Sequence, residues 1–273
     1  MDNRRIGLFD SGLGGLTVMK ELMAVLPKES IVYFGDTSRV PYGGKSVETI
    51  VKYTKSDIRF LETFDLKLVI AACGTASAIA LPRLRGFGSV PIMGVTEATA
   101  RAAASVTENG TVGVIGTEGT IRSGAFCELL QKENPAISCV SVACPLFVPL
   151  VESGFADKKA TRLIAEEYLE PIIKNGADTL ILGCTHYPLL TKVIADIVGD
   201  AVTLVNPGAC AAKEIEAWLA AQDMMAEAPK KEQYHFYVSD TPEGFDRLGS
   251  MFLERPIGGA LSRVDIEAYT EAG

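Results

Sequence analysis

The chain of 273 residues has few histidines, no long apolar run and no excess of basic residues. Its longest uncharged stretches, residues 68–82 and 135–151, are shorter than the roughly 18 residues that a membrane span needs, so we expect no membrane association. Twenty-six Lys and Arg stand against 34 Asp and Glu, and the net charge of −8 argues against a protein that holds nucleic acid. Two histidines, His186 and His235, are too few to suggest a metal site.

Length and composition favour a folded protein of about two domains. Hydrophobic residues make up 48% and charged residues 22%, which is ordinary for a globular chain. The first residues lead into an apolar run at 6–9 that is too short for a signal-peptide core, so we expect a cytoplasmic protein with reduced thiols. Four of the six cysteines are interpreted as packing residues: Cys127, Cys139, Cys144 and Cys210.

Short apolar runs alternate with longer helical stretches along the chain. The runs predicted as strands buried on both faces are 6–9, 31–34, 68–72, 111–115, 138–142, 179–182, 202–205 and 235–239. The stretches predicted as helices are 16–26, 47–64, 121–132, 158–174, 189–198 and 209–220. Such alternation favours an α/β fold with mostly parallel sheets, in which ligands bind beyond the carboxyl ends of the strands. Residues 224–232 are polar and predict a surface loop.

Two segments share one plan and indicate two related lobes. Residues 68–75 (Leu-Val-Ile-Ala-Ala-Cys-Gly-Thr) and 180–186 (Leu-Ile-Leu-Gly-Cys-Thr-His) are both apolar strands that end in a cysteine and a following threonine. The loops at 7–12 and 113–120 also correspond. Related lobes that face each other would bring their strand-end loops to one shared cleft.

Cys73 and Cys184 are therefore the leading candidates for chemistry. Each is predicted at a helix N-terminus, where the helix dipole favours the thiolate. A thiol pair can serve as a redox couple, which requires the sulfurs within bonding distance, or as metal ligands, which requires more partners. A third use is proton exchange on the two faces of one carbon, with one thiolate as base and one thiol as acid.

Polar residues follow other predicted strands. Residues 10–15 (Asp-Ser-Gly-Leu-Gly-Gly) predict a turn that lets the backbone approach a ligand. Gly12, Gly14 and Asp36 also allow a dinucleotide-binding interpretation, although Thr17 occupies the third glycine position. Residues 35–44 predict a turn-rich loop whose amides can bind a carboxylate. His186 is placed to assist Cys184, and Glu152 is predicted to pair with His186.

Five blocks in order resemble the glutamate racemase family of the aspartate/glutamate racemase superfamily. They are 9–18 (Phe-Asp-Ser-Gly-Leu-Gly-Gly-Leu-Thr-Val), 35–43 (Gly-Asp-Thr-Ser-Arg-Val-Pro-Tyr-Gly), 72–77 (Ala-Cys-Gly-Thr-Ala-Ser), 144–152 (Cys-Pro-Leu-Phe-Val-Pro-Leu-Val-Glu) and 183–188 (Gly-Cys-Thr-His-Tyr-Pro). The family commonly has Cys-Asn-Thr where this chain has Cys73-Gly74-Thr75. This departure keeps aspartate or another small acid open as the substrate.

The resemblance implies cofactor-independent interconversion of L- and D-glutamate, with D-glutamate serving peptidoglycan synthesis. It implies two doubly wound lobes, 1–97 plus 208–273 and 98–207, with the active site in the cleft between them, and a homodimer. The catalytic residues would be Cys73 and Cys184, supported by Asp10, His186 and Glu152. The substrate would contact Asp10, Ser11, Pro41, Tyr42, Gly43, Gly74, Thr75, Thr117, Thr120, Thr185 and His186. Two other hypotheses stay open from the residues alone, a nucleotide-dependent oxidoreductase and a non-catalytic binding module.

Overall fold

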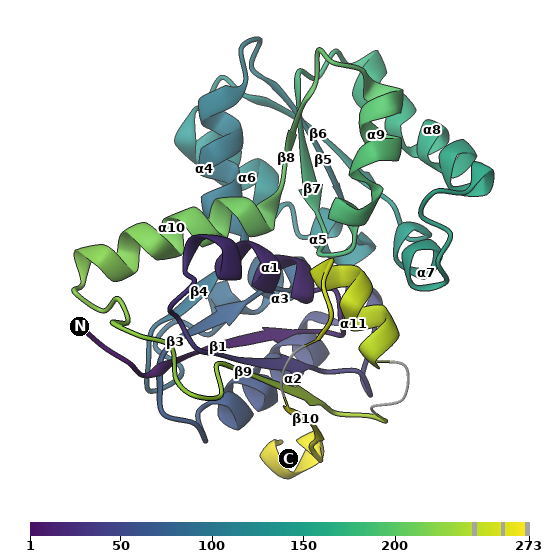
Figure 1. Cartoon of the computed structure of the whole chain (residues 1–273). Coiled ribbons are helices and arrows are strands. Elements are labelled where there is room, and N and C mark those ends of the chain that lie inside the picture. The colour runs from purple at the N-terminus through teal and green to yellow at the C-terminus, as the bar shows by residue number, and fades with distance from the viewer. Residues whose placement is uncertain (242–244, 258–259, 271–273) are drawn as a thin grey trace.

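The structure, a computed structural model, describes residues 1–241, 245–257 and 260–270 and contains two parallel β-sheets (Figure 1). The first sheet has the strand order β10-β9-β2-β1-β3-β4 and the second has the order β6-β5-β7-β8. The strands of the first sheet are β1 (Arg5–Asp10), β2 (Ile31–Gly35), β3 (Leu66–Ala71), β4 (Ile92–Gly94), β9 (Tyr234–Val238) and β10 (Ala260–Arg263). Those of the second are β5 (Thr111–Gly116), β6 (Ser138–Ala143), β7 (Thr179–Gly183) and β8 (Thr203–Val205).

Helices pack around both sheets. The α-helices are α1 (Leu16–Val25), α2 (Val47–Leu61), α3 (Gly74–Ile79), α4 (Thr96–Val106), α5 (Glu118–Arg122), α6 (Ala125–Glu133), α7 (Phe147–Glu152), α8 (Lys159–Lys174), α9 (Thr191–Val198), α10 (Pro207–Ala221) and α11 (Phe245–Leu253). Short 3-10 helices are η1 (Tyr42–Gly44), η2 (Leu81–Arg83), η3 (Tyr187–Leu190) and η4 (Ile266–Tyr269). Within the described ranges, no helix combines the length and apolarity that crossing a membrane requires.

The predicted α/β class with parallel sheets is confirmed, and the eight predicted strands all form. Two strands escaped prediction: β4 has three residues, and β10 is largely exposed and polar, so neither carries an apolar signal. The expectation that every strand is buried on both faces is wrong for β6, because it lies at a sheet edge and is partly exposed. The helix predicted at 121–132 is two helices, since Gly124 takes a positive φ of 69° between α5 and α6.

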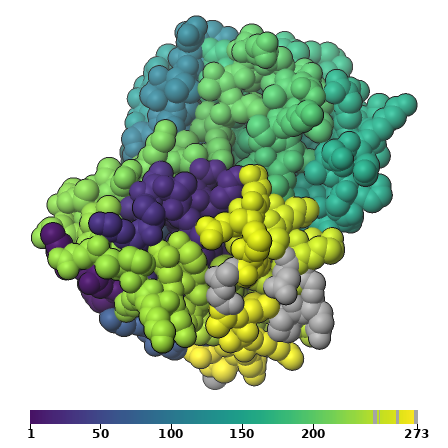
Figure 2. Space-filling view, viewed as in Figure 1, coloured from purple at the N-terminus to yellow at the C-terminus, as the bar shows by residue number. Residues whose placement is uncertain are grey.

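Segments far apart in the sequence form the first sheet and the helices packed against it. Strand β9 pairs with β2, and the C-terminal helices α10 and α11 both pack on α1. Figure 2 shows purple N-terminal residues flanked by green and yellow C-terminal residues on one face. The buried Lys67 Nζ lies 2.6 Å from Oε2 of the buried Glu29, and it also donates to the backbone oxygens of Asp2 and Met224. These contacts join the chain's beginning to residues 224–232, which form the predicted loop.

The interpretation of Cys127 and Cys139 as reduced packing residues is wrong. Their sulfurs form a disulfide of 2.00 Å between α6 and β6. Helix α6 packs on β6 and brings the two Cα atoms to 5.5 Å, which is within the range that a disulfide spans. Of the other two, Cys144 is buried and Cys210 is partly buried, and both are free thiols.

Candidate active site

A cavity of about 400 Å³ lies where the carboxyl ends of strands from both sheets meet. Its volume is in the range of small-molecule sites. The predicted site residues that line it are Ser11, Pro41, Tyr42, Gly43, Cys73, Gly74, Thr75, Thr117, Glu152, Cys184, Thr185 and His186. A larger groove of about 1000 Å³ runs beside α3 to α6, and none of the predicted site residues lines it. The chemistry-bearing residues therefore gather in the smaller cavity.

Cys73 and Cys184 both line this cavity, as their matched sequence contexts predicted. Cys73 follows β3 and directly precedes α3. Cys184 follows β7, and the helix predicted at 189–198 forms as α9 from Thr191. A turn and η3 lie between them, so the expectation that Cys184 stands at a helix N-terminus is wrong. The two thiols thus come from different sheets and are not equivalent in their backbone setting.

The Cys73 side is built from groups of the first sheet. Sγ of Cys73 lies 3.5 Å from the hydroxyl oxygen of Ser11. Burial, and then the charge of Asp10, raise the pKa of Cys73 to about 12. The expectation that the helix N-terminus favours the Cys73 thiolate is therefore wrong, because desolvation outweighs the helix dipole. Cys73 rests as a thiol, the form that can donate a proton.

Asp10 does not itself line the cavity, although the next residues, Ser11 and Gly12, do, so its substrate contact stays a prediction. Its side chain is fully buried, and burial raises its pKa. One carboxyl oxygen accepts a hydrogen bond from the Gly12 N–H at 3.0 Å, and the other lies 3.4 Å from the Thr185 hydroxyl. Asp10 therefore acts on the cavity through its neighbours and its charge.

The Cys184 side is a chain of three groups. Sγ of Cys184 lies 3.9 Å from Nδ1 of His186, and Nε2 of the same ring lies 3.0 Å from Oε1 of Glu152. The predicted pairing of Glu152 with His186 is thus confirmed. Burial lowers the pKa of His186, but its contacts with Cys184 and Glu152 outweigh burial and raise the pKa to about 10. The ring that lies beside Cys184 is therefore an imidazolium at neutral pH.

Three threonine hydroxyls meet at the junction of the two lobes. Thr75 lies 2.9 Å from Thr117 and 3.2 Å from Thr120, and the latter two are 3.0 Å apart. Thr75 comes from α3, whereas Thr117 and Thr120 cap and begin α5. Thr120 is buried and does not itself line the cavity, but it contacts the two threonines that do, so its expected place beside the substrate stays a prediction.

Two glycines allow the lobes to approach closely. A Cβ added at Gly74 would lie 2.8 Å from the backbone oxygen of Gly183, at the end of β7. A Cβ added at Gly14 would lie 2.3 Å from the hydroxyl of Thr185 and 2.6 Å from the ring of His186. Both distances are shorter than real Cβ contacts. A side chain at Gly74 would push against backbone and separate the loops, whereas one at Gly14 would displace the side chains of Thr185 and His186.

Two predicted residues have their side chains turned away from the cavity. Tyr42 lines the cavity, but its hydroxyl lies 2.5 Å from Oδ2 of Asp36 and 2.8 Å from Oδ2 of Asp57. Asp36 is fully buried in this contact and is not placed to bind a ribose, which removes the residue that the dinucleotide interpretation needed. Among the described residues, no group of three or more His, Cys, Asp or Glu side chains is arranged to hold a metal ion.

Several cavity residues were missed by the sequence reasoning. Cys144 was interpreted as packing only, yet it lines the cavity with Val148, Pro149 and Glu118. Burial raises the pKa of Cys144 and keeps it a thiol. Because Cys144 directly follows β6, the rule that ligands bind beyond strand ends would have found it. Val148 and Pro149 lie in α7 and carry no comparable signal.

Comparison with known proteins identifies the family of this chain. A family model described as Asp/Glu/Hydantoin racemase matches residues 13–215. A glutamate racemase from Geobacter metallireducens is 47% identical over 268 residues, which are 98% of this chain and 99% of that protein. The crystal structure of a glutamate racemase isoform from Bacillus anthracis has a TM-score of 0.92 at 37% identity, covering 97% of this chain and 98% of that one. A glutamate racemase from Francisella tularensis, in complex with D-glutamate, has a TM-score of 0.91 at 40% identity, covering 98% and 100%. The chain therefore belongs to the Asp/Glu/Hydantoin racemase family, whose members are isomerases.

Proposed function

We propose that this protein interconverts L- and D-glutamate without a cofactor, using two thiols as proton carriers. The observation that carries the proposal is that Cys73 and Cys184, from different sheets, line one cavity. Each sulfur has its own supporting group, the Asp10 region for Cys73 and the His186–Glu152 pair for Cys184. Two thiols that line one cavity from different sheets suit inversion at a single carbon, which needs a base on one face and an acid on the other.

The proton transfer balances with groups of this chain alone. The thiolate of Cys184 takes the α-proton of one glutamate enantiomer as the Cα–H bond breaks. The thiol of Cys73 then gives its proton to the opposite face of the same carbon, and the product has inverted configuration. The two sulfurs have exchanged protonation states, so the reverse reaction begins from Cys73, and exchange with water restores the first state.

The carbanion-like transition state needs fixed donors and little water. Ser11, Thr75, Thr117 and Thr185 line the cavity with hydroxyls suited to the two carboxylates. The imidazolium of His186 lies at the same wall and adds positive charge. Closure of the two lobes over the substrate would exclude water, and the close contact at Gly74 supports such a closed form.

Isotope exchange during the reaction tests the two-base mechanism. In deuterated water, the newly formed enantiomer should carry α-deuterium, while the remaining starting enantiomer stays mostly protonated early in the reaction. Nuclear magnetic resonance of the α-position measures both. Equal early labelling of both enantiomers would instead indicate that one base serves both faces.

Cysteine variants test the assignment of the two sulfurs. Cys73→Ser and Cys184→Ser should each nearly abolish racemisation, measured by circular dichroism of glutamate. Cys210→Ser is the matched control, because Cys210 is a free, partly buried thiol that does not line the cavity. Retained activity in either cavity variant would remove that cysteine from the mechanism. A preference for aspartate in the same assay would favour the alternative, a racemase or isomerase of another small acid.

The wider setting is part of the same proposal. We propose that the D-glutamate serves peptidoglycan synthesis in the cytoplasm and that the protein is a homodimer. We also propose 1–97 plus 208–273 and 98–207 as the two lobes. Analytical ultracentrifugation tests the dimer, and dependence of a depletion strain on added D-glutamate tests the cellular role.

A further inference from the structure

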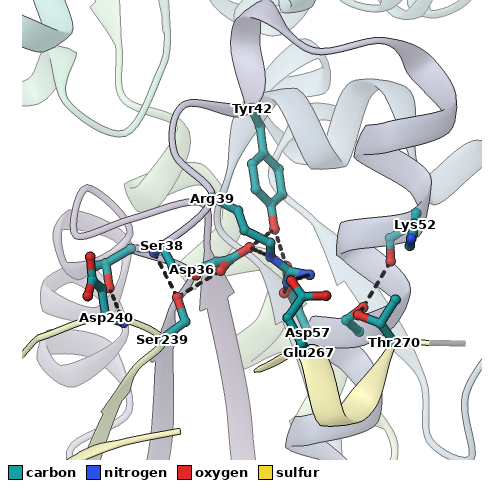
Figure 3. Close-up of polar contacts among 12 residues, drawn as sticks. Asp36, Ser38, Arg39, Tyr42, Lys52, Asp57, Ser239, Asp240, Glu267 and Thr270 are labelled. Carbon is teal, nitrogen blue, oxygen red and sulfur yellow. Dashed lines mark hydrogen bonds and ion pairs between the residues drawn. The ribbon is translucent and has the colours of Figure 1, made fainter. Parts of the chain in front are cut away.

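A buried polar cluster lies directly behind the cavity wall formed by residues 41–44 (Figure 3). It consists of Asp36, Arg39, Tyr42 and Asp57, here called the Asp36–Asp57 unit. Figure 3 shows the Arg39 guanidinium between the two carboxyl groups and the Tyr42 hydroxyl pointing at both. Asp36 and Asp57 are fully buried, and Arg39 and Tyr42 are nearly so. Two buried acids share one guanidinium, so the number of protons that the two acids carry decides whether the unit has a net charge.

Asp36 is surrounded by hydrogen-bond donors. Its Oδ2 accepts from Nε of Arg39 at 2.6 Å and lies 2.5 Å from the Tyr42 hydroxyl oxygen. Its Oδ1 accepts from the hydroxyl of Ser239, at the end of β9, at 2.8 Å. Because an ionised carboxylate only accepts hydrogen bonds, these three contacts fit an ionised Asp36.

Asp57 has the opposite requirement. Its Oδ1 accepts from Nη2 of Arg39 at 2.9 Å, and its Oδ2 lies 2.8 Å from the Tyr42 oxygen. The Tyr42 hydroxyl has a single proton, which the shorter contact places toward Asp36. The Tyr42–Asp57 contact then needs a second proton, and a protonated Asp57 supplies it. One carboxylate, one carboxylic acid and one guanidinium leave the unit neutral, as burial requires.

The unit is connected to the cavity and to the C-terminal segment. Tyr42 begins η1, and Gly43 is wedged against α5, since a Cβ added at Gly43 would lie 2.7 Å from Cβ of Thr117. On the other side, Ser239 bonds to Asp36, and Oε1 of Glu267 lies 3.7 Å from Nη1 of Arg39. Residues 41–44 are therefore held between α5 and the buried unit.

Resting on the proposed racemisation, we propose that Asp36, Arg39 and Asp57 are positioning residues that hold the 41–44 turn as a wall of the substrate cavity, with Asp57 as the proton-donating member. None of the three lines the cavity, so each acts on the substrate through the turn. Burial, and then the charge of Asp36, raise the pKa of Asp57 well above its ordinary value, which agrees with the proton count.

The two acids should respond differently to the same isosteric change. Asn at position 57 can donate to the Tyr42 oxygen and accept from Arg39, so Asp57→Asn should keep kcat/KM for glutamate within about threefold of wild type. In Asp36→Asn, the amide NH2 would face groups that are themselves donors: Arg39, Tyr42 and Ser239. The turn would then be held less firmly, so kcat/KM should fall by roughly tenfold or more, mainly through a higher KM. If Asp36→Asn does not fold, Ser239→Ala removes one donor to Asp36 more gently and should raise KM in the same direction.

Infrared spectroscopy tests the protonation without any activity. The difference spectrum of wild type minus Asp57→Asn should contain the C=O stretch of a protonated carboxylic acid, because the bands of the other buried acids cancel in that difference. Absence of that band, or equal damage from Asp57→Asn and Asp36→Asn, would overturn the proposal. If the wild-type protein does not racemise glutamate, the proposed function is wrong, but the infrared test of the Asp57 proton is unaffected.

Discussion

Gly74→Ala tests whether the close approach of the two lobes is needed for activity. The added methyl carbon would lie 2.8 Å from the Gly183 backbone oxygen, whereas ordinary contact begins at 3.4 Å. The lobes must therefore separate by about 0.6 Å at this point, because a backbone carbonyl at the end of a paired strand cannot rotate away. Overpacking of this kind costs about 1–3 kcal/mol. If the closed form is the reactive one, kcat/KM for glutamate should fall by about 5- to 150-fold.

The assay follows racemisation from both enantiomers by circular dichroism, together with thermal unfolding. Gly44→Ala is the matched control, because Gly44 belongs to the same cavity wall and an added Cβ there would meet nothing within 4 Å. Gly74→Asn should be at least as impaired as Gly74→Ala, since both share the offending Cβ. Wild-type kcat/KM and unchanged thermal stability in Gly74→Ala would refute the reasoning that position 74 must be bare for the lobes to meet.

Two further predictions concern stability. Because the folded-state pKa of His186 is about 10 and its ordinary value is 6.5, its contribution to stability is fully present below pH 6.5 and is lost as pH rises through 10. Glu152→Gln removes one cause of the raised pKa, so the fall in Tm should end at a lower pH and be smaller; superimposable profiles of Tm against pH would contradict this. Lys67→Met leaves the buried Glu29 carboxylate without its ion pair and should cost about 3–5 kcal/mol in urea unfolding. Glu254→Gln, which breaks an exposed ion pair, should cost under about 1 kcal/mol, and an equal loss in both would contradict the role of burial.

Local patterns were sufficient for the architecture. The apolar runs at 68–72 and 179–182 predicted β3 and β7, because strands buried on both faces are recognisable from consecutive apolar residues. The cysteine that follows each run therefore had to lie at a strand end. Strands β4 and β10 were not predicted, because β4 is short and β10 is polar. Their places in the sheet depend on pairing with β3 and β9.

The sequence by itself determined the two α/β series, their parallel sheets and the strand-end positions of Cys73 and Cys184, because these depend on residues close together in the chain. Tertiary structure alone decided the disulfide of Cys127 with Cys139, the inward turn of the Tyr42 hydroxyl and the raised pKa of Cys73. Each of these depends on which distant groups meet and how much water they exclude. Desolvation and hydrogen-bond geometry arise only when the chain is packed, so no local pattern could have carried them.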